Sequence, residues 1–190
     1  MIVKIILFTC LACTISASKA QEKDSLQDYF LHQKDITIKG MKILRTWGAV
    51  NLGVGIVGEF NSEGTAFYFH QMNSLWGGFN LLFSSLTIRA VRRQEPITDY
   101  SYWEMKQIKL EKIFLINAGF DVLFIGAGAG MLNLSTRDGV EKERLEGYGY
   151  SVIMQASSLL IFDSILYLLH KRNRKKRMSR LIRTDIYLDN

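Results

Sequence analysis

The sequence predicts an all-α protein, an integral membrane up-down bundle of four helices built from two duplicated helical hairpins. Three observations lead to this prediction. Charged residues gather in four segments and leave long stretches between them nearly free of charge. These stretches provide four apolar runs, of which two reach the roughly 20 residues that cross a bilayer. The connections are short, so consecutive helices are expected to lie antiparallel and side by side.

Residues 1–20 predict a secretory signal peptide. Lys4 precedes a short apolar core, and the small residues Ser18 and Ala20 form a cleavage site. Both cysteines lie inside that core with a C-x-x-C spacing, whereas a redox pair would belong beside a βαβ unit. The expected order of the chain is a signal peptide at 1–20, a polar segment at 21–37, a four-helix transmembrane domain at 38–172 and a basic tail at 173–190.

The first hairpin is expected to join the spans 43–58 and 67–91. Its first span is short, and a helix of bilayer length needs the amphipathic residues from about Ile36 onwards. The acidic connection EFNSEGTAF is short as well, which makes the two helices neighbours. After the second span, Pro96 breaks the helix.

The second hairpin is expected to join the spans 113–134 and 148–169, which both have the length of a membrane helix. Its first helix is expected to begin before the span, with Asp99 or Ser101 as the N-cap. An Asp-Gly pair at 138–139 supplies the turn between the two helices.

One polar residue falls inside each apolar run, on a helical face that also carries small residues. These residues are Asn51, Asn80, Asp121 and Asp163. Because an ionised aspartate at a helix centre costs about 2.5 to 3.5 kcal/mol on insertion scales, both aspartates are expected to face inward. We expect one buried polar cluster, either a set of hydrogen bonds that fixes helix register or a site for a proton, cation or solute. The further contributors considered are Asn73, His70 and Asn117.

Glycines are expected to let helix backbones approach closely, as small residues do in membrane bundles. The run FIGAGAGM also resembles part of a dinucleotide-binding fingerprint, but Met131 stands where the third small residue belongs, and no strands and helices alternate around it. Leu166 is expected to face lipid. The glycines expected at helix contacts are Gly48, Gly55, Gly58, Gly77, Gly126 and Gly130.

An internal repeat relates the two hairpins. A shift of 70 residues carries Asn51 onto Asp121, and a shift of 83 carries Asn80 onto Asp163. The first hairpin therefore has asparagines where the second has aspartates. Two such hairpins are expected to pack their small and polar faces together.

No catalytic, cofactor or metal site is expected, because the sequence contains no nucleophile motif, P-loop or zinc-ligand spacing. The expected function is that of a non-enzymatic scaffold or interaction subunit. The alternative is a small proton-, cation- or solute-handling transporter or channel-like subunit that uses Asp121 and Asp163. The expected partners are the lipid bilayer, anionic head groups at the basic tail, and a second copy of the chain or another membrane protein, but no nucleic acid.

Four sequence blocks follow one another in the mature chain: WGAVNLGVGIVG, FYFHQMNSLWGGFNLL, LEKIFLINAGFDV and GYGYSVIMQASSLLIFD. They resemble an uncharacterised family, a domain of unknown function, of small bacterial four-helix membrane proteins with an N-terminal signal peptide. The resemblance covers about residues 38–172 and implies an architecture without an activity. We accordingly expect a multi-pass protein of a bacterial membrane, the inner membrane.

Two signals disagree about the orientation. Basic residues flank the connection between the second and third spans and also follow the fourth span, which places both regions in the cytoplasm by the positive-inside rule. Four spans then place residue 21 in the cytoplasm too, whereas a cleaved signal peptide requires it on the opposite side.

Overall fold

The described residues are all-α and form four helices, as the sequence predicts. This computed structural model describes the backbone of residues 2–96 and 99–188, and the side chains of residues 26–96 and 99–176. No strand occurs among the described residues. The helices are α1 (Ile2–Asn61), α2 (Gly64–Arg92), α3 (Tyr100–Leu134) and α4 (Lys142–Leu188).

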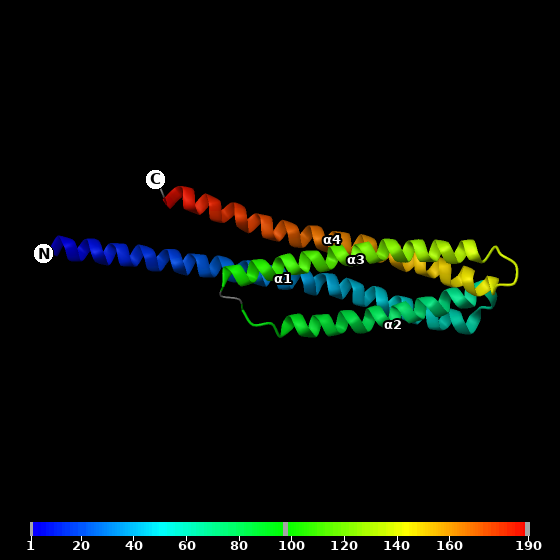
Figure 1. The fold of residues 1–190 in the computed structure, drawn as a ribbon. Helices are drawn as coiled ribbons and strands as arrows, with labels where there is room; N and C mark the ends of the chain where they lie inside the picture. The colour runs from blue at the N-terminus through cyan, green and yellow to red at the C-terminus, as the bar shows by residue number, and fades with distance from the viewer. Residues whose placement is uncertain (1, 97–98, 189–190) are drawn as a thin grey trace.

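The four helices form two hairpins. Consecutive helices run in opposite directions, and both chain ends lie at the same end of the bundle (Figure 1). α1 packs along α2, α3 packs along α4, and α2 also packs against α4. α1 touches α3 and α4 only slightly, and the described parts of α2 and α3 make no close backbone contact. The hairpins therefore meet mainly through α2 and α4.

α1 is far longer than the predicted span 43–58. It runs without interruption from Ile2 to Asn61, about 90 Å at a rise of 1.5 Å per residue. Figure 1 shows that the N-terminal part of α1 and the C-terminal part of α4 extend beyond the other two helices. The predicted signal peptide lies within this helix, and its side chains lie outside the described residues. Its cleavage stays a prediction.

Local sequence signals set the other helix ends. Asp99, and not Ser101, caps α3, because its carboxylate accepts a hydrogen bond of 2.9 Å from the backbone N–H of Tyr102. Gly64 opens α2 with a φ of +59°, and Gly139 has a φ of +75° in the turn before α4. Both angles lie in the left-handed region that glycine adopts without the steric cost of a Cβ atom.

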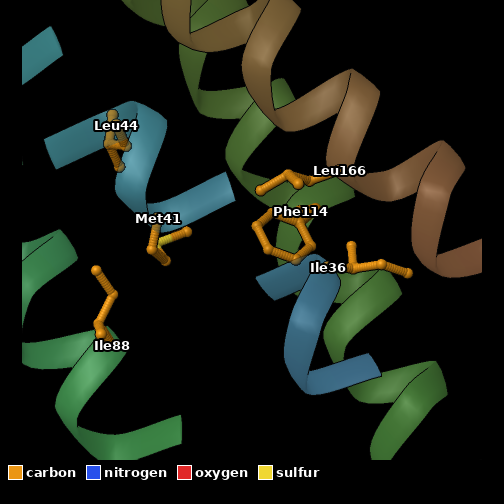
Figure 2. Packing of buried hydrophobic residues seen from close by; sticks show 6 residues of the cluster. All are labelled: Ile36, Met41, Leu44, Ile88, Phe114 and Leu166. Carbon is orange, nitrogen blue, oxygen red and sulfur yellow. The ribbon is translucent and has the colours of Figure 1, made fainter. Parts of the chain in front are cut away.

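An apolar cluster takes residues from all four helices (Figure 2). The expectation that Leu166 faces lipid is wrong, because this side chain is only 3% exposed. Gly40 creates the space that it fills, since a Cβ atom at Gly40 would lie 2.7 Å from Leu166 Cδ2. The buried members of the cluster are Ile36, Met41, Leu44, Ile88, Phe114 and Leu166.

Elsewhere the bundle buries polar side chains and exposes apolar ones. The buried face of α2 contains Asn73 and Asn80, whereas Leu75 on the same helix is 68% exposed. α3 and the Lys142–Lys176 part of α4 are long and apolar enough to cross a membrane, by length and composition. Only 17% and 28% of their most apolar stretches are buried in the bundle. The core helix of a soluble protein would instead be mostly buried.

Candidate functional site

The four polar residues that the sequence singles out are all buried, but they form two groups instead of one cluster. Asn51 is 7% exposed, Asn80 2%, Asp121 5% and Asp163 6%. Asn80, Asp121 and Asp163 line one pocket, whereas Asn51 belongs to a separate hydrogen-bond network. Asn51 instead accepts a hydrogen bond from Gln155 on α4, whose side chain also bonds to Trp47 of α1 and Asn73 of α2.

We call the first group the amide network; it consists of Trp47, Asn51, Asn73, Ser151 and Gln155. Nε2 of Gln155 donates to Oδ1 of Asn51 at 2.8 Å and to Oδ1 of Asn73 at 2.9 Å. Oε1 of Gln155 accepts from Nε1 of Trp47 at 3.0 Å. Ser151 donates to Asn73 Oδ1 at 2.8 Å. These bonds connect α1, α2 and α4, so they bridge the two hairpins.

The second group, which we call the carboxyl pocket, contains Asn80, Asn117, Asp121 and Asp163 in a cavity of about 520 Å³ that all four helices line. The carboxyl groups of Asp121 and Asp163 lie within hydrogen-bonding reach of each other, and the Asn117 amide lies near Asp163. Oδ2 of Asp121 and Nδ2 of Asn80 are buried and have no hydrogen-bond partner among the described residues. The pocket therefore presents one free acceptor and one free donor.

Aromatic side chains form the outer walls of the carboxyl pocket. Phe79 and Phe83 come from α2, Phe120 and Phe124 come from α3, and all four are between 41% and 60% exposed. Trp76 meets Phe124 edge to face with ring centroids 5.5 Å apart. Because these walls also lie on the outer surface, the pocket opens sideways between α2 and α3.

A third polar group lies toward the end of the bundle that carries both chain ends. Nε and Nη2 of Arg174 each donate to one carboxylate oxygen of Glu111, both at 2.9 Å. Nε2 of Gln107 donates to the carbonyl oxygen of His170 at 2.7 Å. The His170 ring is fully buried and stacks on Phe114 with centroids 5.4 Å apart. This group joins α3 to α4 and is absent from the predicted site.

The remaining predicted contributors divide among different places. Asn73 belongs to the amide network, and Asn117 belongs to the carboxyl pocket. His70 belongs to neither group. A Cβ atom on Gly58 would lie only 2.2 Å from Cγ of the His70 ring, so this ring packs directly against the glycine. Among the described residues, no group of three or more His, Cys, Asp or Glu side chains could hold a metal ion.

The glycines of the first hairpin lie at the contact between α1 and α2. A Cβ atom on Gly77 would be 2.3 Å from the backbone nitrogen of Leu52, and one on Gly48 would be 2.6 Å from that of Leu81. Gly55 and Gly58 are equally close to α2.

The packing expected at Gly126 and Gly130 is wrong, since a Cβ atom at either would meet nothing within 4 Å. Gly128 and Gly149 make the close contact between α3 and α4 instead. The helical period explains this outcome. Gly128 lies seven residues after Asp121 and shares its inward face, whereas Gly126 and Gly130 point away from that face.

Four residues of the buried polar groups are not singled out from the sequence: Ser151, Gln155, Glu111 and Arg174. Gln155 and Ser151 are polar residues inside an apolar run, which is the same signal that identified Asp163. Their helical positions, one and five residues from Ala156, put them beside the face of small residues, and not on it. Glu111 and Arg174 are 63 residues apart in charged segments, so no local pattern pairs them.

Comparison with known proteins adds a family but no activity. No curated protein and no solved structure matches the chain. A family of unknown function matches residues 43–164, which is more than half of the chain. The matched region contains the amide network and all of the carboxyl pocket except Thr37 and Met41 of its lining. The chain belongs to the family of unknown function DUF6992.

Proposed function

We propose that the chain is a non-enzymatic membrane scaffold or interaction subunit, in which buried polar side chains hold two related hairpins together. The amide network carries this proposal. Gln155 makes hydrogen bonds to three residues on two helices of the other hairpin, and such bonds fix the register of helices where surrounding lipid offers no polar alternative.

Membrane embedding is supported by the dimensions of the apolar surface. Apart from Tyr102 and Met105 near its start, the exposed apolar side chains on α3 extend from Ile113 to Leu134, about 32 Å at the helical rise. Apart from Leu31, those described on α1 extend from Ile43 to Phe60, about 26 Å. Both lengths are near the roughly 30 Å hydrocarbon core of a bilayer. We place the protein in the inner membrane of a bacterium as a multi-pass protein.

A duplication of the hairpin is supported by an equivalent contact in each half. Gly58 lies against the side chain of His70 in the first hairpin, and Gly128 lies against Ile153 in the second. The shifts of 70 and 83 residues that align the polar residues also carry Gly58 onto Gly128 and His70 onto Ile153. The same helix–helix approach thus recurs at matching positions.

The second candidate function is transport of a proton or cation, and one observation favours it. Asp121 and Asp163 lie within hydrogen-bonding reach of each other, and a bond between them requires a proton on one of them, because an ionised carboxylate only accepts hydrogen bonds. A proton held inside an apolar bundle is a component of many proton relays. The half-exposed aromatic walls of the carboxyl pocket, however, favour access from the side of the bundle.

Two measurements on the purified full chain distinguish the candidates. Gln155→Met is expected to lower the unfolding free energy in detergent by about 2 kcal/mol or more, since each of three interhelical bonds contributes about 0.6 kcal/mol or more. Gln71→Met is the matched control, because Gln71 accepts a single interhelical bond, from Tyr148. In liposomes, proton or sodium flux that Asp163→Asn abolishes would overturn the scaffold in favour of transport.

A further inference from the structure

We propose that the carboxyl pocket binds an uncharged lipid that carries a free hydroxyl group, with the hydroxyl held between Asn80 and Asp121 and the hydrocarbon tail lying among the aromatic walls. This inference rests on the proposed membrane embedding, but it goes beyond the scaffold role. It names a ligand class that neither the fold nor the family supplies.

The polar end of the pocket requires a ligand atom that both accepts and donates. Nδ2 of Asn80 is a buried donor, and Oδ2 of Asp121 is a buried acceptor, and neither is bonded to any described residue. Leaving such groups unpaired costs about 1–3 kcal/mol each. A hydroxyl oxygen accepts from the amide while its hydrogen is donated to the carboxyl, so one group satisfies both.

The charge of the pocket selects against other head groups. The Asp121–Asp163 pair already holds two acidic groups close together, so a fatty-acid carboxylate would add a like charge next to them. A protonated amine can donate to Asp121 but has no lone pair to accept from Asn80. A hydrocarbon without a head group leaves both polar atoms unpaired. The hydroxyl is the simplest group that meets every condition.

The apolar part of the pocket fits a lipid tail that enters from the side. The half-exposed rings of Phe79, Phe83, Phe120 and Phe124 line the cavity and also face outward. The volume of about 520 Å³ lies within the roughly 300–1,000 Å³ range of ligand pockets. α2 and α3 are neighbours that lack a close backbone contact in the described chain, so a tail can pass between them without separating packed helices.

The test uses four probes with the same 18-carbon tail, which are oleyl alcohol, oleylamine, oleic acid and octadecene. Binding to the full chain in detergent is measured by native mass spectrometry and by the rise in Tm with probe concentration, which reports binding to the folded state. We expect the alcohol to bind with one molecule per chain and at least about tenfold more tightly than the other three. Equal binding of alcohol and octadecene, or tighter binding of the acid or amine, would overturn hydroxyl recognition.

Variants locate the site. Asn80→Leu removes the donor and is expected to abolish the preference for alcohol over octadecene. Asn61→Leu is the matched control, since it makes the same change at an exposed position at the end of α1, outside the pocket and the amide network, and it should keep the preference. If Asn80→Leu fails to fold, Asn80→Ser and the four-probe series on the unchanged chain decide the question.

The outcomes separate this inference from the membrane proposal. A chain that needs detergent for extraction from membranes, but binds no probe while folded, overturns the ligand site alone. A chain that is released from membranes without detergent overturns the embedding on which the ligand site depends.

Discussion

The carboxyl groups of Asp121 on α3 and Asp163 on α4 lie within hydrogen-bonding reach of each other inside the bundle. Since one of them must supply the proton, the pair acts as a neutral donor and an acceptor across the second hairpin. The corresponding residues of the first hairpin are Asn51 and Asn80. An asparagine amide at either position carries N–H donors at every pH, so it can replace the protonated carboxyl as the hydrogen-bond donor.

Asp163→Asn is therefore expected to change the unfolding free energy by less than about 1 kcal/mol, because an amide donor replaces the protonated carboxyl. Asp163→Leu removes the bond and leaves Asp121 without a partner, which should cost about 1–3 kcal/mol. Thermal unfolding of both variants in detergent measures the difference. Severe unfolding by Asp163→Asn would contradict both the shared proton and the equivalence of the hairpins.

Two glycines provide a matched pair for the packing argument. Gly77→Ala places a Cβ atom 2.3 Å from the backbone of Leu52, so the helices must separate, at a cost of about 1–3 kcal/mol or more. Gly126→Ala meets nothing within 4 Å and should be neutral or stabilise the helix by up to about 1 kcal/mol. The yield and Tm of the two proteins, purified in parallel, check this. Equal tolerance would mean that α1 and α2 do not approach closely at Gly77.

The helices and their caps follow from local sequence, whereas the partners across helices do not. Asp99 caps α3 with its carboxylate, and Gly139 adopts the left-handed backbone of the turn before α4. The seven-residue interval from Asp121 to Gly128 places both residues on one face of α3. The polar pattern therefore predicts which residues are buried. It does not reveal that Asn51 bonds to Gln155 while the other three polar residues line one pocket. The reach of a long side chain between two other helices depends on the packed bundle.

Packing also decides the environment of Leu166. A leucine in an apolar run looks the same in the sequence whether its side chain faces lipid or protein. The burial of Leu166 depends on Gly40, which is 126 positions earlier in the chain.

We now expect Leu166→Ala to cost about 2–5 kcal/mol by opening a cavity. Leu168→Ala is the control, because Leu168 is 60% exposed, and its effect should be much smaller. Equal losses of stability would place Leu166 outside the core.

The ion pair between Glu111 and Arg174 gives a separate prediction for the end of the bundle near the chain termini. Arg174→Met leaves the Glu111 carboxylate, whose side chain is 7% exposed, without its cation. We expect a loss of about 1–3 kcal/mol, below the 3–5 kcal/mol of a fully buried pair, because Arg174 itself is partly exposed. The double variant Glu111→Gln with Arg174→Met should recover part of this loss. A double-mutant cycle on chemical unfolding measures the coupling, and additive losses would show that the bidentate bonds contribute nothing.

The orientation in the membrane is tested by reporter fusions after residues 62, 98 and 138 and at the C-terminus. The up-down course of the helices predicts that the connection between α2 and α3 lies on the same side as the C-terminal end of α4, with the other two connections on the opposite side (Figure 1). Residue 98 and the C-terminus on opposite sides would contradict the four-span topology.

The side on which the C-terminus lies also decides between the two conflicting sequence signals. α1 runs unbroken through the predicted cleavage site, so the helix itself does not show whether the chain is cut there. If the basic residues dominate, the C-terminus is cytoplasmic, and the N-terminal residues must stay on that side and remain attached. If the signal peptide dominates, the mature chain begins at Gln21 and the C-terminus is periplasmic. The intact mass of the purified protein and the fusion data must therefore agree, since only these two combinations are compatible with four spans. A cleaved chain with a cytoplasmic C-terminus would require an odd number of crossings, and one of the four helices would then have to lie outside the bilayer.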